Sequence, residues 1–149
     1  MMRRLFIQAG AATALIAAAP FFIASYAQDA PTGGKKRQKI VIQVSDSDPA
    51  KWNLALNNAK NLQEDVGAAN VDIEIVAYGP GIGMLKLESP SGSRVTEAMT
   101  ANVKVIACEN TMRGQKLTRD DMLSAITYVP AGVTEIMTKQ SEGWSYLRP

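Results

Sequence analysis

The chain of 149 residues contains no histidine and a single cysteine, Cys108. Without histidine, the usual general base for a serine or cysteine nucleophile is missing, so the protease-type and esterase-type triads are excluded in their common forms. With one cysteine, no disulfide can form within the chain. No carboxylate cluster accompanies Asp46 and Asp48, and helix capping explains both of them. We therefore expect neither a metal nor a cofactor.

The chain also lacks a charge excess that would attract nucleic acid. Its 16 basic and 14 acidic residues give a net charge of +2, but two of the arginines, Arg3 and Arg4, belong to an N-terminal leader. The remainder is balanced, so we expect no nucleic-acid partner. Outside the leader, no apolar run approaches the roughly 20 residues of a membrane-spanning helix. We expect no membrane association unless the leader is retained.

Residues 1–27 have the pattern of a signal peptide: two arginines, an alanine-rich apolar run, and the small-x-small sequence Ser25-Tyr26-Ala27. The stretch Arg3-Arg4-Leu5-Phe6 resembles a twin-arginine signal, and an ordinary secretory signal is the alternative. Either pathway predicts export to the periplasm. Residues 28–38 are polar and contain proline and glycine, which predicts a flexible linker. Residues 39–149 are then enough for one domain.

From Lys39 onward, β-branched runs alternate with amphipathic segments. Strands are predicted over residues 39–44, 71–78, 103–108 and 126–130, and helices over 49–66, about 93–100, a brief turn after Thr118, and 132–147. The alternation of charged residues in 71–78 predicts a strand with one wet face near a sheet edge. The whole pattern predicts an α/β fold, a flavodoxin-like three-layer sandwich with a mostly parallel sheet of about five strands.

In such a sheet, ligands bind at the carboxyl ends of the strands. Three segments follow strands there, namely residues 45–48, 78–84 and 108–112, and we expect them to converge on one rim. The glycine-rich segment matches neither a dinucleotide fingerprint nor a P-loop, so a turn that needs positive φ explains it better. The candidate site residues are Cys108 as the reactive group and, around it, Asn110, Thr111, Tyr78, Gly79, Gly81, Gly83, Ser45 and Asp46.

Two roles are open for Cys108. The turn that begins at Glu109 can aim backbone N–H groups at the sulfur, and Arg113 and Lys116 are candidate cations; both effects lower the pKa of a thiol, whereas the charge of Glu109 opposes them. Alternatively, free cysteine is among the most buried residue types and packs as a small apolar group. Position alone does not decide between a reactive and a structural cysteine.

Four segments of the chain resemble the DsrE/DsrF-like family, in particular its exported single-domain members. They are residues 39–67, 76–85, 103–112 and 130–149, and the resemblance runs from about Lys39 to Pro149, essentially the whole expected domain. The most telling parts are the cysteine followed by Asn110-Thr111-Met112 and the closing Gln-x-x-Gly-Trp pattern at 140–144.

The resemblance implies an α/β sandwich that assembles into homo- or hetero-oligomers, often trimers or hexamers, and a link to sulfur metabolism; for this chain we expect a homo-oligomer. In the sulfur-relay members a cysteine in this region accepts a persulfide, and Cys108 is the residue here that matches it. We therefore expect a periplasmic persulfide carrier or sulfurtransferase with a sulfur donor or acceptor protein as partner. Two alternatives remain: a non-catalytic oligomeric module that binds a ligand or partner and has a structural cysteine, and a redox sensor that forms an intermolecular disulfide.

Overall fold

The computed structural model describes residues 36–149, and at its centre five parallel strands form one sheet in the order β4-β3-β2-β1-β5. The strands are β1 (Gln38–Val44), β2 (Val71–Ala77), β3 (Lys104–Cys108), β4 (Thr127–Val129) and β5 (Ser145–Leu147). The helices are α1 (Pro49–Val66), α2 (Gly92–Thr100), α3 (Glu109–Gly114) and α4 (Gly132–Ser141), with short 3-10 helices η1 (Ala68–Asn70), η2 (Gly79–Leu85) and η3 (Arg119–Asp121). The predicted α/β fold class is confirmed.

The predicted signal peptide and most of the predicted linker lie outside the described residues. The linker prediction extends to residue 38, but Gln38 is the first residue of β1 and pairs with Val71 of β2. Within residues 36–149, no helix combines the length and the hydropathy that a membrane span needs.

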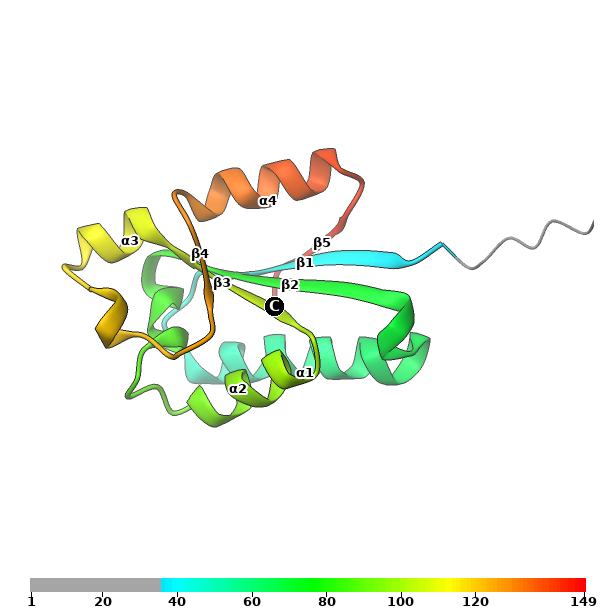
Figure 1. Ribbon diagram of the computed structural model, residues 1–149, viewed down its shortest axis with the longest axis horizontal. Coiled ribbons are helices and arrows are strands. Elements are labelled where there is room, and N and C mark those ends of the chain that lie inside the picture. Colours follow the sequence, from blue (N-terminus) through cyan, green and yellow to red (C-terminus); the bar gives the residue numbers. More distant parts are fainter. Residues whose placement is uncertain (1–35) are drawn as a thin grey trace, which may run out of the picture. The chain divides into compact units, whose positions relative to one another are not determined.

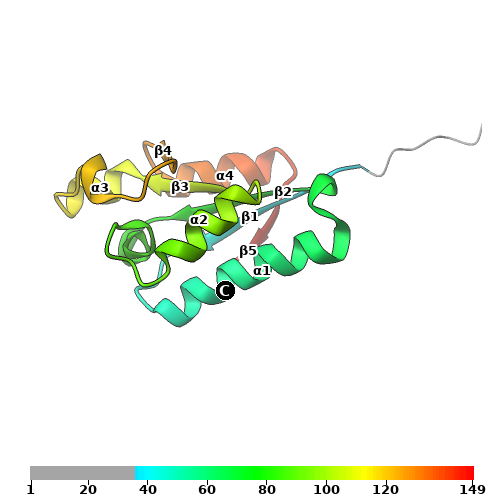
Figure 2. The same cartoon turned by 60° about the horizontal axis from the view of Figure 1, so that its bottom comes forward.

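The sheet is covered unequally on its two faces (Figures 1 and 2). Helices α1 and α2 lie on one face and α4 lies on the other. The larger apolar core lies under α1 and α2 and includes Ile42, Ile75, Leu56 and Val95. The smaller core lies under α4 and consists of the buried residues Val41, Val76, Ile106 and Ile136. Because this core is small, few apolar contacts fix the position of α4 on the sheet.

Helix α1 forms as its sequence predicts. The side chain of Asp48 accepts a hydrogen bond of 2.8 Å from the N–H of Ala50, and Pro49 occupies the first turn, where its missing N–H costs nothing. The buried stripe is Trp52, Ala55, Leu56 and Ala59. This stripe attaches α1 to the larger core and places the first rim segment at the carboxyl end of β1.

The prediction that the second strand lies near an edge is wrong. Strand β2 lies between β1 and β3, and Glu74 is only 1% exposed. The charged residues that suggested a wet face are held in ion pairs instead: Asp72 with Arg37 at 2.7 Å and Glu74 with Lys104 at 3.2 Å. The Asp72 side chain remains 34% exposed, whereas at Glu74 an ion pair replaces contact with water, a difference that periodicity does not reveal.

The prediction of a helix over 132–147 is wrong in its last third. Helix α4 ends at Ser141, and Gly143 follows with a φ of +83°, which breaks the helical path. The chain then forms β5, which pairs in parallel with Ile40–Ile42 of β1. Trp144, which lies inside the predicted helix range, therefore lies between α4 and β5 and packs on the smaller core. Trp52 of α1 is buried, at 6% exposure.

The close contact between η2 and the end of β1 depends on Gly81. A Cβ atom at this position would lie 2.2 Å from the carbonyl oxygen of Val44, which is backbone and cannot move aside locally. We predict that Gly81→Ala lowers the free energy of unfolding by about 2 kcal/mol or more, because overpacking of a well-packed site costs about that much. Urea unfolding followed by tryptophan fluorescence measures this change.

Gly114→Ala is the matched control for that experiment, since a Cβ atom there meets nothing within 4 Å. Gly114 is the last residue of α3, where alanine costs no more than glycine, so the control is expected to unfold within about 0.5 kcal/mol of the wild type or at higher urea. Equal stabilities of the two variants would contradict the close contact at Gly81.

Candidate functional site

Cys108 is the last residue of β3 and also the N-cap residue of α3. Cys108 lies two residues after Ile106 in the strand, so both side chains point to the same face of the sheet. This is the face that α4 covers. The residue is 4% exposed and pairs across the ladder with Val129 of β4. The thiol therefore lies at the carboxyl edge of the sheet, in the place where this fold class holds its ligands.

The amino end of α4 faces the sulfur. The N–H of Gly132, the first residue of α4, points to Sγ of Cys108. A Cβ atom on Gly132 would lie 3.2 Å from both the Cβ of Tyr78 and a methyl group of Val76, so a larger residue would push the start of α4 away from the sheet. The segment before α4 is fixed to α3 by a hydrogen bond of 3.1 Å from the N–H of Asn110 to the carbonyl of Pro130.

The electrostatic surroundings favour the thiolate. Burial raises the pKa of the Cys108 thiol, but the Thr111 hydroxyl and the N–H groups of Gly132, Thr111 and Asn110 together outweigh burial, and the net pKa is lowered from its ordinary value. The groups that lower the pKa are thus three backbone N–H groups and one hydroxyl around the sulfur. Ten residues of α4 add the partial positive charge of a helix amino end.

Thr111 connects the thiol to the glycine-rich segment. Its hydroxyl oxygen accepts a hydrogen bond of 2.9 Å from the N–H of Gly79, which leaves the hydroxyl hydrogen to be donated to the sulfur. The side chain of Gln115 donates to the carbonyl of Gly79 at 3.2 Å. Gly79 has a φ of +53°, in agreement with the prediction of a turn that needs positive φ. The segment after β2 and the segment after β3 therefore form one connected rim.

Some of the predicted site residues lie elsewhere. Ser45 accepts a hydrogen bond from Gln43 at 3.0 Å, and Asp46 forms ion pairs with Lys51 at 3.1 Å and Arg148 at 3.5 Å. The carboxyl end of β1 is separated from Cys108 by the width of β2, so the two rim positions are about 10 Å apart. The structure thus links Ser45 and Asp46 to β1, α1 and the end of the chain rather than to the thiol.

Of the three predicted glycines, one lies near the thiol and two lie near β1 and α1. Gly79 contacts Thr111 as described, whereas Gly81 packs on the end of β1 and Gly83 lies under the Trp52 ring, where a Cβ atom would approach to 3.1 Å. Tyr78 packs with the smaller core beside Gly132. The residues gathered at the thiol are therefore Tyr78, Gly79, Asn110 and Thr111, with Gly132 added.

Neither candidate cation, Arg113 or Lys116, is among the groups that lower the pKa of Cys108. Arg113 donates a hydrogen bond to the side chain of Asn110, and Glu109 forms an ion pair of 3.0 Å with Arg119. The guanidinium of Arg119 also lies 4.4 Å from the ring centre of Tyr128. Backbone N–H groups and one hydroxyl, rather than lysine or arginine, are therefore the main groups that lower the pKa of Cys108. In the part of the chain that the structure describes, no group of three or more acidic or cysteine side chains could hold a metal ion.

Gly132 is the residue that sequence reasoning missed. It lies 24 positions after Cys108, and their proximity comes from the parallel pairing of β3 with β4. The sequence did contain a signal for it, because the predicted strand at 126–130 is followed at once by a predicted helix. If that strand is a parallel neighbour of the strand at 103–108, the amino end of the helix lies at the same rim as Cys108. The sequence does not specify which strands are neighbours.

We predict that Thr111→Val raises the pKa of Cys108, because valine keeps the shape of threonine but cannot donate to the sulfur. The expected result is alkylation by iodoacetamide at neutral pH that is slower by about fivefold, and a pH midpoint shifted upward, as hydrogen bonds to charged groups carry about 1 kcal/mol or more. Rates measured across a pH series give both quantities.

Thr100→Val is the control, since the hydroxyl of Thr100 bonds within α2, to the carbonyl of Thr96 at 2.9 Å. Its alkylation profile is expected to match the wild type. A Thr111→Val profile with an unchanged midpoint would contradict the electrostatic role of the hydroxyl.

Solved structures from three organisms resemble this chain. A protein of unknown function from Methanobacterium thermoautotrophicum, MTH1491, is 34% identical, with a TM-score of 0.72 over 75% of this chain and 99% of that one. Two others share the fold at low identity. BT1422 of Bacteroides thetaiotaomicron, also of unknown function, is 12% identical, with a TM-score of 0.62 over 78% and 98% of the two chains. The ychN protein of E. coli is 18% identical, with a TM-score of 0.60 over 75% and 99%.

No curated protein matches the chain. The sequence model of the DsrE/DsrF-like family, in contrast, matches residues 38–149, from the first residue of β1 to the end of the chain. That match covers every strand and helix described above, including the cysteine, the glycine-rich segment and α4. The chain therefore belongs to the DsrE/DsrF-like family.

Proposed function

We propose that this protein is a persulfide carrier and that Sγ of Cys108 is the atom that accepts sulfur. The observation that carries the proposal is the position of the thiol between the Thr111 hydroxyl and the amino end of α4, where its pKa is lowered despite burial. A sulfur carrier needs a thiolate nucleophile and does not need a histidine base. Family membership points in the same direction, toward sulfur relay.

The reaction is a transfer of sulfane sulfur without net oxidation. The Cys108 thiolate attacks the outer sulfur of a donor persulfide or polysulfide, a new S–S bond forms at Sγ, and the donor's S–S bond breaks. The donor leaves as a thiolate, and the proton of its terminal S–H passes to solvent or to the leaving sulfur. An acceptor thiolate that attacks the bound outer sulfur reverses these events and restores the Cys108 thiolate.

The groups around Cys108 suit both forms of the carrier. A bound persulfide is also an anion near neutral pH, and the N–H groups that favour the thiolate are placed to stabilise it. The hydroxyl oxygen of Thr111 accepts from the N–H of Gly79, so its hydrogen is free to be donated to the sulfur. We infer that the same donors keep the leaving sulfur anionic when the acceptor attacks.

The setting of this carrier is part of the proposal. The leader pattern of residues 1–27 supports export to the periplasm, where partner proteins would supply and remove the sulfur. Two apolar residues one turn apart on the outer side of α4, Val133 and Met137, are 59% and 62% exposed. A homo-oligomer interface over α4 would cover this apolar pair, and we include such an interface in the proposal.

A second candidate function is favoured by the burial of the thiol. At 4% exposure, Cys108 is as buried as the apolar residues of the core, which fits an oligomeric ligand- or partner-binding module with a structural cysteine. In that case the lowered pKa has no consequence, because no donor reaches the sulfur. The two candidates differ in whether the folded protein accepts sulfur.

Mass spectrometry of the intact protein after incubation with inorganic polysulfide distinguishes them. The carrier proposal predicts a mass gain of one sulfur atom in the native wild type, lost on treatment with dithiothreitol, and no gain in Cys108→Ala. A native wild type without this gain, together with a thiol that iodoacetamide modifies only after denaturation, would overturn the proposal and favour the structural cysteine.

A further inference from the structure

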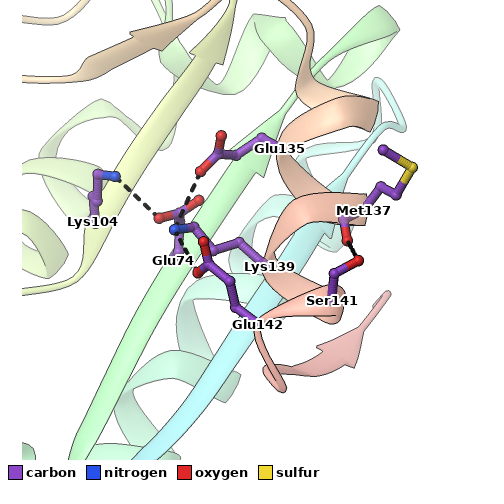
Figure 3. Close-up of polar contacts among 7 residues, drawn as sticks. All are labelled: Glu74, Lys104, Glu135, Met137, Lys139, Ser141 and Glu142. Carbon is purple, nitrogen blue, oxygen red and sulfur yellow. Dashed lines mark hydrogen bonds and ion pairs between the residues drawn. The ribbon is translucent and has the colours of Figure 1, made fainter.

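A buried carboxyl group lies in the middle of the sheet, away from the thiol. Glu74 of β2 is 1% exposed, and its strand neighbours Ile73 and Ile75 are buried apolar residues. An ionised side chain in such a place costs several kcal/mol unless other groups compensate for the lost water. Figure 3 shows the polar side chains around it: Lys104 of β3 and, from the α4 segment, Glu135, Lys139 and Glu142. Of these, Lys104 forms the ion pair with Glu74.

The two oxygens of Glu74 have different surroundings. Oε2 accepts from the ammonium group of Lys104 on β3 at 3.2 Å. Oε1 is buried without a hydrogen-bond donor among the described residues, and the Glu135 carboxyl group of α4 lies against this side chain. Burial raises the pKa of Glu74, Lys104 lowers it and Glu135 raises it, with a net increase. A proton on Oε1 of Glu74 would let this atom donate a hydrogen bond to the Glu135 side chain.

The charges around this pair are consistent with one bound proton. Lys139 of α4 lies 3.6 Å from Glu135 and 3.3 Å from Glu142, and its side chain is only 16% exposed. Burial lowers the pKa of Lys139, but the carboxylates, Glu74 first among them, raise it above its ordinary value. Three carboxyl groups therefore face two ammonium groups, those of Lys104 and Lys139. One proton makes the cluster neutral.

Helix α4 connects this cluster to the thiol. Its first residue, Gly132, directs its N–H to Cys108, and Glu135 and Lys139 follow at one and two turns along the helix. The apolar contact beneath the helix is small, with Ile136 as its own buried apolar residue. Polar groups of α4 beside Glu74 of β2 therefore supplement a small apolar contact between the helix and the sheet.

We propose that Glu74 is a positioning residue for Cys108: its buried carboxyl group holds Glu135 and Lys139 of α4 against the sheet, so that the amino end of α4 stays on the thiol. The inference rests on the proposed function only in treating the thiol as the reactive group. A well-packed apolar residue at 74 would stabilise the sheet at least as well, but it would not specify where along β2 the helix sits.

The test compares the pH profile of Cys108 alkylation in four proteins. Glu74→Leu removes the polar group and keeps most of its volume. Glu74→Gln keeps a donor for Glu135 without charge. Asp72→Asn is the control, because Asp72 lies two residues away on the same strand and its ion pair is with Arg37, not with α4. Thermal unfolding of each variant measures stability separately.

The proposal predicts that Glu74→Leu shifts the pH midpoint upward and slows alkylation at neutral pH by about threefold, because a displaced helix amino end contributes roughly 0.3–1 kcal/mol less to the thiolate. Glu74→Gln and Asp72→Asn are expected to keep the wild-type midpoint. A purely structural role for Glu74 predicts the opposite change, since a loosened fold exposes the thiol and alkylation becomes faster at an unchanged midpoint.

An unchanged midpoint in Glu74→Leu would overturn the proposal, and so would a shift of equal size in Asp72→Asn. If Glu74→Leu does not fold, Glu135→Ala carries the same prediction from the helix side, since alanine is well tolerated in a helix and removes the same contact. The readout is the ionisation of the thiol. A protein that fails to accept sulfur from polysulfide but shows these shifts therefore contradicts the carrier function and leaves the positioning role of Glu74 intact.

Discussion

The contact between the amino end of α4 and the sulfur of Cys108 is the feature on which the site depends. It exists because β3 and β4 are parallel neighbours, so that the chain leaves both strands at the same edge and starts a helix after each. Gly132 allows the second helix to approach the sheet without a collision at Tyr78. The N–H groups brought there, with the Thr111 hydroxyl, offset the burial that would otherwise keep the thiol neutral.

The sheet is covered unequally, so the contact between α4 and Cys108 is sensitive to changes in how α4 is attached. The face under α1 and α2 has an extended apolar core, whereas α4 rests on a small one. The ion cluster around Glu74 adds polar contacts where apolar ones are few, with Lys104 and Lys139 as its cations. Reactivity of the thiol and attachment of α4 are then properties of one structural unit. The same helix carries exposed apolar residues, so a partner bound there would act on that unit directly.

Local signals in the sequence were enough for most of the fold. The cap at Asp48 and the apolar stripe after it located α1, and the β-branched runs located the four strands that were predicted. The edge position predicted for the second strand and the helix predicted over 132–147 were wrong for the same reason. In both places contacts between distant parts of the chain decided the structure, and local periodicity does not report them. Glu74 is buried because a lysine of the next strand pairs with it, and Trp144 leaves the helix because β5 pairs with β1. For the site, neighbouring residues such as Thr111 were predictable, whereas Gly132 required the strand order.

Folding is expected to lower the pKa of the Cys108 thiol below its value in the unfolded chain. The most direct measurement is a titration of the thiolate absorbance in the ultraviolet, with Cys108→Ala subtracted, for the native protein and for the same protein unfolded in urea. The account predicts a midpoint in the native protein below that of the unfolded chain. A native midpoint equal to or above the unfolded one would show that burial prevails over the hydrogen-bond donors, and it would contradict the assignment of Cys108 as a reactive thiol.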